Sequence, residues 1–411
     1  MSQGRANRSR APITNWFRER QTDDTLLEPD SNSKLTARAN CVTRELELAT
    51  AIPCGETVIR RDGGLRFDTP TARWSYALRF DLPAWAATPF VLGVSIGAIS
   101  GRLGVGCVNA AGTAYTSGEL LWDADAEVVT KWILVENAAA RAVIVRNVCE
   151  TSGSRGVLTS IHVRRVEACS AAELKQLRSQ RFGYWHYEFD LGDGVTVPAT
   201  LPGIMDFHRL NQRILLGLLN ANFETGRTVL DAACSAGYHA FALADCGLRV
   251  TGIDIDEASI EQARFVQSCL ADANAASVAF HHCDLLKFES REPFDAIWCS
   301  GLFYHLRDLV GGACKLYELS RGGAVIQCCV AGMDGAYLEV ADANKWPCCS
   351  PREFSFVPTA KALTAILTFA GFRTVRQYPA MQLCATDDLL SLTPTYAALM
   401  REHTAYYVAL K

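Results

Sequence analysis

The chain has 411 residues, of which 49% are apolar and 20% are charged. This is the composition of a globular protein with a sizeable core, and it excludes a wholly disordered, collagen-like or coiled-coil chain. Forty Lys and Arg against forty-four Asp and Glu leave a formal charge of −4, which argues against non-specific nucleic-acid binding but not against a local basic patch.

Residues 1–40 are polar and rich in Arg, Asp and Ser, without a sustained hydrophobic period. They are expected to form a flexible tail and linker rather than a targeting peptide, because Pro12 interrupts the pattern and acidic residues soon follow. The longest charge-free stretch, residues 83–101, contains Pro, Gly, Ser and Thr, so we expect no membrane span and no membrane partner.

The chain contains sixteen cysteines, which are scattered and form no C-x-x-C pair. Several lie inside apolar runs, such as Cys299 and Cys328. We interpret them as buried structural thiols of a reducing compartment, with no metal site and no disulfide framework. A cytoplasmic location is the corresponding expectation.

Residues 41–166 are predicted to form an all-β accessory domain. Apolar side chains alternate along one strand, which predicts one buried face: Trp74, Tyr76, Leu78, Phe80 and Leu82. Further strands are expected at 90–96, 103–109, 132–137, 142–148 and 157–166. Short strands at this spacing are typical of a sandwich or a jelly roll. Its tryptophans are expected either to stack on a sugar or to lie in the core: Trp74, Trp85, Trp122 and Trp132.

The pattern changes near residue 168. A helix is predicted at 170–182, with Ser170 as N-cap and Glu173 completing a capping box. Strands are then expected at 228–234, 248–255, 277–284, 294–301, 324–330 and 372–379, and helices at 237–247, 257–273, 309–320 and 359–371. This alternation predicts a parallel, doubly wound α/β sheet for residues 168–411.

Acidic residues end three successive predicted strands of this sheet: Asp231, Asp254 and Asp284. Strand ends of an open α/β sheet form the ligand crevice, and an acid at the second strand can accept both hydroxyls of a ribose. The arrangement favours an adenosyl ligand, and the alternative is three surface carboxylates at loop starts. Ala233 and Ser235 stand where glycines are expected, and neither adopts a positive φ as freely as Gly.

Four segments resemble successive motifs of class I S-adenosylmethionine-dependent methyltransferases: VLDAACSAGYHAF, VTGIDIDEASIEQAR, CDLLKF and FDAIWCSGLFYHL. The resemblance covers about 180–380 and is closest to the branch that contains the tRNA wobble-uridine carboxymethyltransferase. Further segments indicate that branch: YWHYEFDLGDGVTVP, GYH and WPCCSPREFSFVPT. The resemblance implies a Rossmann-like methyltransferase fold with S-adenosyl-L-methionine as cofactor.

The resemblance also implies cofactor contacts. Those to the methionine and ribose parts are Asp231, Ala233, Ser235, Gly237 and Asp254, those to adenine are Ile255, Asp284 and Leu285, and Ser300 lies beneath the sulfonium.

The catalytic candidates are Tyr304 and His305, which follow the fourth strand at the mouth of the crevice. An imidazole is suited to accept a proton near neutrality, so His305 is predicted to act as a base, with a structural role or a cofactor or substrate contact as the alternatives. Tyr304 is a positioning candidate, because a phenol is normally protonated at pH 7. Trp185 and Tyr187 are expected either to cover the cofactor as a lid or to pack on the sheet.

The expected function is methyl transfer from S-adenosylmethionine to an O or N atom of a small molecule, natural product or sugar. One alternative is tRNA wobble-uridine-type modification, but a run of Lys or Arg that would bind RNA is missing, so nucleic acid is the less favoured acceptor. The other is a β-sandwich binding module fused to an inactive cofactor domain, which the altered loop at 233–237 motivates.

Overall fold

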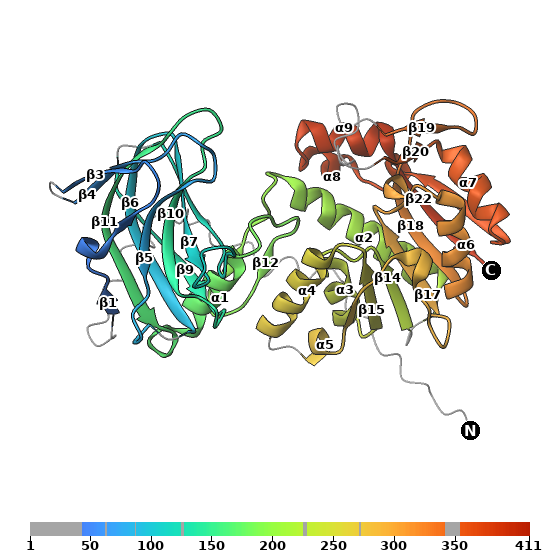
Figure 1. Ribbon diagram of the computed structural model, residues 1–411. Coiled ribbons are helices and arrows are strands. Elements are labelled where there is room, and N and C mark those ends of the chain that lie inside the picture. The colour runs from blue at the N-terminus through green and yellow to red at the C-terminus, as the bar shows by residue number, and fades with distance from the viewer. Residues whose placement is uncertain are drawn as a thin grey trace, which may run out of the picture. The chain divides into compact units, whose positions relative to one another are not determined.

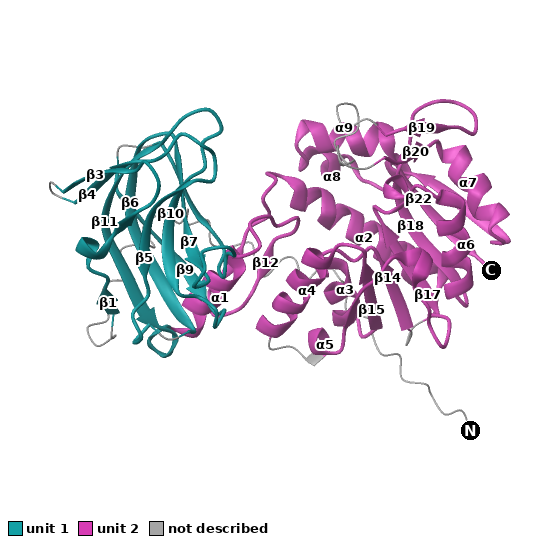
Figure 2. Cartoon of the chain, viewed as in Figure 1, with its two compact units in different colours: residues 1–169 teal, residues 170–411 magenta. Residues whose placement is uncertain are grey.

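The computed structural model describes residues 43–61, 64–86, 88–124, 127–224, 228–270, 273–341 and 354–411. The chain divides into two compact units, residues 1–169 and 170–411 (Figure 2). The predicted tail at 1–40 lies outside the described residues, as does the WPCCSPR part of the C-terminal segment.

The first unit consists of two antiparallel sheets (Figure 1). One has the order β3-β4-β11-β6-β9, with β1 beside β11, and the other has the order β2-β5-β10-β7-β8. The strands of the first are β1 (Thr43–Glu45), β3 (Val58–Arg61), β4 (Leu65–Asp68), β6 (Phe90–Ser100), β9 (Val129–Val135) and β11 (Arg155–Arg165). Those of the second are β2 (Ile52–Pro53), β5 (Tyr76–Asp81), β7 (Arg102–Val108), β8 (Leu120–Asp123) and β10 (Ala142–Asn147).

Both sheets contribute to one hydrophobic core, in which Leu92 and Ile161 of one sheet pack with Phe80 and Val143 of the other. Alternating apolar residues produce this arrangement, because every second side chain of a strand points to the same face.

The predicted alternation fails at Trp74. Leu78 and Phe80 are fully buried on β5 as expected, but Trp74 precedes the strand with a left-handed φ of 69° and is 45% exposed. The chain turns at this residue, so its ring leaves the predicted buried face. Trp122, by contrast, lies in the core.

The second unit is built on a seven-stranded sheet with the order β16-β15-β14-β17-β18-β22-β21. Its strands are β14 (Thr228–Ala232), β15 (Arg249–Asp254), β16 (Ala279–His282), β17 (Ala296–Ser300), β18 (Gly323–Cys329), β21 (Thr374–Pro379) and β22 (Thr404–Leu410). The first five are parallel, and their order is that of the doubly wound nucleotide-binding sheet. The expectation of a wholly parallel sheet is wrong at one edge, because β22 runs antiparallel between β18 and β21.

Helices cover both faces of this sheet (Figure 1). Val229, Trp298 and Val325 face one apolar core, and Leu230 and Ile297 face the other. The helices are α1 (Ala171–Gln180), α2 (Ile204–Asn222), α3 (Tyr238–Asp245), α4 (Glu257–Cys269), α5 (Ala273–Ala276), α6 (Leu309–Leu319), α7 (Ala360–Phe369), α8 (Thr386–Leu390) and α9 (Pro394–His403). Two antiparallel two-stranded sheets complete the unit: β12 (Phe189–Asp190) with β13 (Thr196–Val197), and β19 (Leu338–Val340) with β20 (Phe356–Pro358).

The predicted capping box at the start of α1 is confirmed, with Ser170 and Glu173 each bonding the backbone N–H of the other. In the described parts of the chain, no helix is both long enough and apolar enough to cross a bilayer.

Candidate functional site

A cavity of about 470 Å³ lies at the carboxyl ends of the parallel strands of the second unit. Such ends meet at one edge of the sheet, where doubly wound proteins bind their ligands. Six of the residues predicted for the site line the cavity: Ala233, Asp254, Ile255, Asp284, Leu285 and His305. The remaining predicted residues do not line it.

The loop between β14 and α3 has left-handed backbone at alternate positions. The φ angles are 65° at Ala233, 48° at Ser235 and 85° at Gly237. Gly237 has no substitute here, because a Cβ would meet the Phe280 ring at 2.7 Å. Ala233 and Ser235 have a side chain, and for such residues the left-handed conformation costs about 1–2 kcal/mol. Strain of this kind is commonly found at functional sites.

Replacing Ala233 or Ser235 with glycine is expected to stabilise the second unit. The free energy gained by removing the strained conformation is larger than the free energy lost because glycine gives the unfolded chain more conformational entropy. Each change should therefore raise the free energy of unfolding by about 0.5–1 kcal/mol. Thermal unfolding measures this, with Gly237→Ala as the control that should lower Tm. A lower Tm in both glycine variants would contradict the strain at these positions.

Asp254 ends β15 and holds the loop by hydrogen bonds. Its Oδ2 accepts from the N–H of Ser235 at 2.8 Å, and its Oδ1 accepts from the N–H of Asp256 at 2.9 Å. Burial raises the pKa of this carboxyl. Ile255 follows it and is 70% exposed at the cavity wall. The carboxylate is thus oriented by backbone donors while it also faces the cavity.

Three buried polar atoms lie close together on one face of the sheet without a hydrogen-bond partner among the described residues. They are Oδ2 of Asp231, Nε1 of Trp298 and Nε2 of His239. Asp231 and Trp298 are paired across β14 and β17, and the rings of His239 and Trp298 are 5.3 Å apart. Because an unpaired buried polar group is costly, this cluster indicates a place for a polar ligand group or water.

The Asp231 carboxyl is only 1% exposed. Burial, with a smaller contribution from the charge of Asp254, raises its pKa to about 8, although an N–H of Ala240 bonds it. The carboxyl is therefore largely protonated at neutral pH in the free protein. A cationic group beside it would favour the charged form.

This raised pKa predicts a pH-dependent loss of stability. Between the unfolded pKa of about 3.9 and about 8, the folded state binds the proton that the unfolded state releases, so the free energy of unfolding falls as pH rises. Asp231→Asn lacks this carboxyl, so its stability should not fall in this way. The difference in stability between the variant and wild type should therefore shift in favour of the variant as pH rises from 5 to 9. Melting temperatures of both proteins across this range measure the difference, and a constant difference would contradict the prediction.

Asp284 and Ser300 are both fixed by hydrogen bonds. Asp284 accepts from the N–H of Leu286 at 3.0 Å and begins a short 3-10 turn that carries Leu285 into the cavity wall. Ser300 donates to Oε1 of Gln327 at 3.3 Å at the end of β17. These contacts anchor the loops on either side of the crevice.

Tyr304 and His305 lie in a 3-10 turn after β17, with ring centroids 4.6 Å apart. Only His305 of the two lines the cavity. The Tyr304 hydroxyl instead lies beside Gly301, where it is 3.0 Å from the position that a Cβ would take.

A cluster of histidines that the sequence pattern did not predict lies near the crevice. His186 and His208 share a hydrogen bond at 3.0 Å between their Nε2 atoms, and Tyr184 bonds Nδ1 of His186 at 3.2 Å. Burial, assisted by the charge of His305, lowers the pKa of His186 to about 4, so its ring is neutral at pH 7. His208 comes from α2, a helix that was not predicted. Four of the eight histidines thus gather near the crevice: His186, His208, His239 and His305.

Trp185 and Tyr187 do not line the cavity. Trp185 packs in the core against Phe182 and Phe265 and donates from Nε1 to the carbonyl of Ser179 at 3.2 Å. Tyr187 is buried and stacks on Tyr238 at the start of α3, with centroids 4.9 Å apart. Their positions agree with packing on the sheet rather than with a lid over the cavity.

A family model for a methyltransferase domain matches residues 229–321. The chain is similar to the tRNA U34 carboxymethyltransferase of Klebsiella pneumoniae (strain 342), with 28% identity over 168 residues, 40% of this chain and 48% of that protein. It is 31% identical over 155 residues to the tRNA U34 carboxymethyltransferase of Marinobacter nauticus, covering 37% of this chain and 45% of that protein. The chain thus spans about half the length of the curated relatives it matches.

Among solved structures, the N-terminal domain of EvdMO1 with SAH bound is similar over 59% of this chain and 96% of that chain. The sequence identity is 16% and the TM-score is 0.42.

Proposed function

Because its second unit carries a class I S-adenosylmethionine-dependent methyltransferase domain, we propose that this protein transfers a methyl group from S-adenosylmethionine to an O or N atom of a small molecule, natural product or sugar.

The unpaired Oδ2 of buried Asp231 carries the proposal. The methionine end of the cofactor bears an ammonium group, which would donate to this oxygen and stabilise its charged form. Asp254 lies at the cavity and would accept the ribose hydroxyls, while Asp284 and Leu285 would flank the adenine. The donors and acceptors present thus fit the cofactor in kind.

The cofactor supplies a methyl group activated by a positively charged sulfur. The chain has to position the acceptor atom for in-line attack and to exclude water. When the acceptor is a hydroxyl, its O–H bond would break as the bond from oxygen to the methyl carbon forms, whereas a protonated amine would first lose a proton to expose its lone pair. In both cases a ring nitrogen of His305 would take the proton, and the bond between the methyl carbon and sulfur would break with its electron pair staying on sulfur. His305 lines the same cavity as Asp254 and Asp284, which would contact the adenosine part.

The main alternative is tRNA modification, which the names of the similar proteins favour. A formal charge of −4 and the absence of a Lys or Arg run in the sequence support the smaller acceptor. Incubation with methyl-labelled S-adenosylmethionine tests the choice, with sugars and hydroxylated or aminated small molecules in one series and bulk tRNA in the other. Label in the first series alone supports the proposal, and label in tRNA alone overturns it.

We also propose that the methyltransferase unit binds cofactor without the β-rich unit. Contacts cluster into separate units on either side of residue 169, and each unit has its own core. A chain that begins at Ala168 is therefore expected to fold and to bind S-adenosylmethionine with an affinity within about threefold of the full chain, since no predicted cofactor contact is removed. Calorimetry on both proteins measures this, and an insoluble or non-binding fragment would contradict it.

A further inference from the structure

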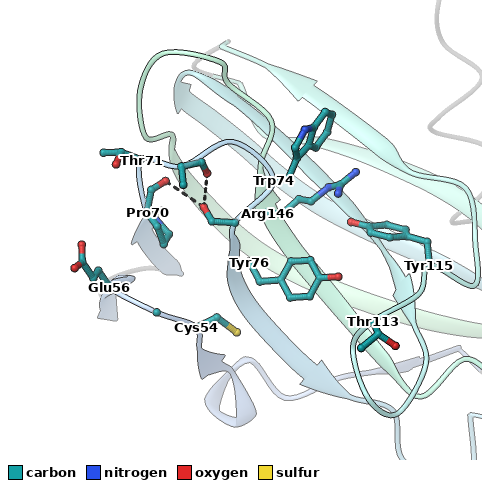
Figure 3. Close-up of a pocket in the computed structure, with 12 residues that line it drawn as sticks. Cys54, Glu56, Pro70, Thr71, Trp74, Tyr76, Thr113, Tyr115 and Arg146 are labelled. Atoms are coloured by element: carbon teal, nitrogen blue, oxygen red, sulfur yellow. Dashed lines mark hydrogen bonds between the residues drawn. The ribbon is translucent and has the colours of Figure 1, made fainter.

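A cavity of about 850 Å³ lies on the first unit, far along the chain from the methyltransferase motifs. It lies where the loop at 70–75 meets the starting residue of β5, the loop after β7 and the strand β10. Figure 3 shows the aromatic side chains of Trp74, Tyr76 and Tyr115 around it, with the Arg146 side chain between Trp74 and Tyr115.

Arg146 fixes these rings in place. Its guanidinium carbon lies 4.4 Å from the centroid of the Trp74 ring and 4.5 Å from that of Tyr115. Its Nε and Nη2 each donate to Glu119 at 2.6 Å, and the pair is less than one-fifth exposed. A bidentate ion pair that is mostly buried has little freedom to move, so this wall of the pocket is preorganised.

Trp74 is held in an unfavourable conformation that exposes it. Its left-handed φ of 69° is costly for a large side chain. The buried side chain of Asn147 holds the neighbouring loop by donating to the carbonyls of Thr71 and Ala72, and the N–H of Trp74 donates to the carbonyl of Asn147 at 2.8 Å. The fold thus maintains a strained residue whose ring is 45% exposed, as is common where the residue serves binding.

Neighbouring glycines make room for the pocket wall. A Cβ on Gly106 would meet the Tyr115 ring at 2.6 Å, and a Cβ on Gly104 would overlap the Glu119 carboxylate. Both glycines lie on β7, where a larger residue would push Tyr115 or the partner of Arg146 out of place.

The polar groups of the pocket favour an uncharged ligand over an anionic one. Of the lining residues that the structure describes, Arg146 and Glu56 are charged. Because Arg146 is neutralised by Glu119, the Glu56 carboxylate remains as a negative charge that disfavours an anionic ligand. Hydroxyl groups of Thr71, Thr113 and Tyr76 lie around the same space. Aromatic rings beside hydroxyl groups and a carboxylate that can accept hydrogen bonds match a polyhydroxylated ligand, which has an apolar C–H face and polar edges.

We propose that this pocket binds a neutral sugar residue, whose C–H face stacks on Trp74. The guanidinium of Arg73 also lies 4.4 Å from this ring, but it is 41% exposed and its partner Glu150 is a surface residue. A surface ion pair contributes little, so a ligand displaces Arg73 from the ring at low cost while Arg146 stays in place. The sugar hydroxyls then meet Glu56 and the threonine hydroxyls.

The test is binding of the full chain to an immobilised array of neutral glycans, with sulfated and phosphorylated glycans and proline-rich peptides on the same array. The decisive variant is Trp74→Gly, which removes the ring and relieves the left-handed backbone together. The matched control is Ile99→Ala, since Ile99 is a similarly exposed apolar residue of the same unit that does not line the pocket.

Wild type and Ile99→Ala are expected to bind at least one class of neutral glycan. Trp74→Gly should bind it at least about tenfold more weakly, which is the scale of one lost aromatic contact, with an equal or higher Tm and unchanged S-adenosylmethionine affinity. Retained glycan binding in Trp74→Gly overturns the proposal. So does binding confined to anionic glycans or peptides, or no binding to the array. None of these outcomes depends on methyl transfer, so they leave the proposed function of the second unit separately testable.

Discussion

Replacing His305 with alanine is expected to lower kcat by about 10²–10⁴-fold while leaving the affinity for S-adenosylmethionine nearly unchanged. His305 lines the cavity from the turn after β17, whereas the predicted adenosine contacts come from the ends of β15 and β16. Loss of a base slows proton removal from the acceptor without removing a predicted cofactor contact. Steady-state rates and calorimetric titration of the same preparation separate the two effects.

His305→Gln is the control that distinguishes a base from a structural residue. Glutamine keeps a hydrogen-bonding group but accepts a proton poorly, so a base predicts a similar loss of kcat. The wild-type rate should also rise with pH as an imidazole loses its proton, and the variant should lack that inflection. His186 is excluded as its source, because burial lowers its pKa to about 4. Near-wild-type turnover in His305→Gln would exclude the base and leave positioning by Tyr304.

Replacing Asp254 with alanine is expected to weaken S-adenosylmethionine binding by about 10- to 100-fold, the scale of hydrogen bonds to a charged group. The variant loses the acceptor proposed for the ribose hydroxyls. It also loses the contact that holds the N–H of Ser235 at 2.8 Å, so the strained loop should become less well ordered. Both losses are expected to weaken the binding of S-adenosylmethionine.

Asp256→Ala is the matched control for this variant. Asp256 is two residues away and exposed, and it caps α4 by accepting from the N–H of Ser259 at 3.0 Å. Its removal should lower stability by about 1 kcal/mol with little effect on affinity. Calorimetry on both variants gives the comparison. An unchanged Kd in Asp254→Ala would remove this residue from the binding site.

Elements with a clear local pattern could be predicted from the sequence. The capping box of Ser170 and Glu173 is local, as is the alternation that placed Leu78 and Phe80 in a buried face. The carboxyl ends of β15 and β16 bring Asp254 and Asp284 to one cavity because parallel strands share a direction, which the α/β alternation indicates.

Features set by tertiary contacts could not be predicted. Most residues of strand β22 are apolar, so its sequence does not indicate its direction. It lies antiparallel between β18 and β21 because α9, which precedes it, brings the chain to that position. Trp74 continues an alternating pattern in the sequence, yet the contacts of Asn147 turn the backbone there. The histidine cluster joins His186 and His208 from separate elements, and no local spacing relates them.

We propose that the second unit binds S-adenosylmethionine at the carboxyl ends of its parallel strands. Isothermal titration of the full chain with S-adenosylmethionine measures this binding. We expect saturable binding at one site, which Asp254→Ala weakens and Asp256→Ala retains. Absence of binding at millimolar ligand to a folded protein would contradict it and would favour a β-rich binding module joined to an inactive cofactor domain.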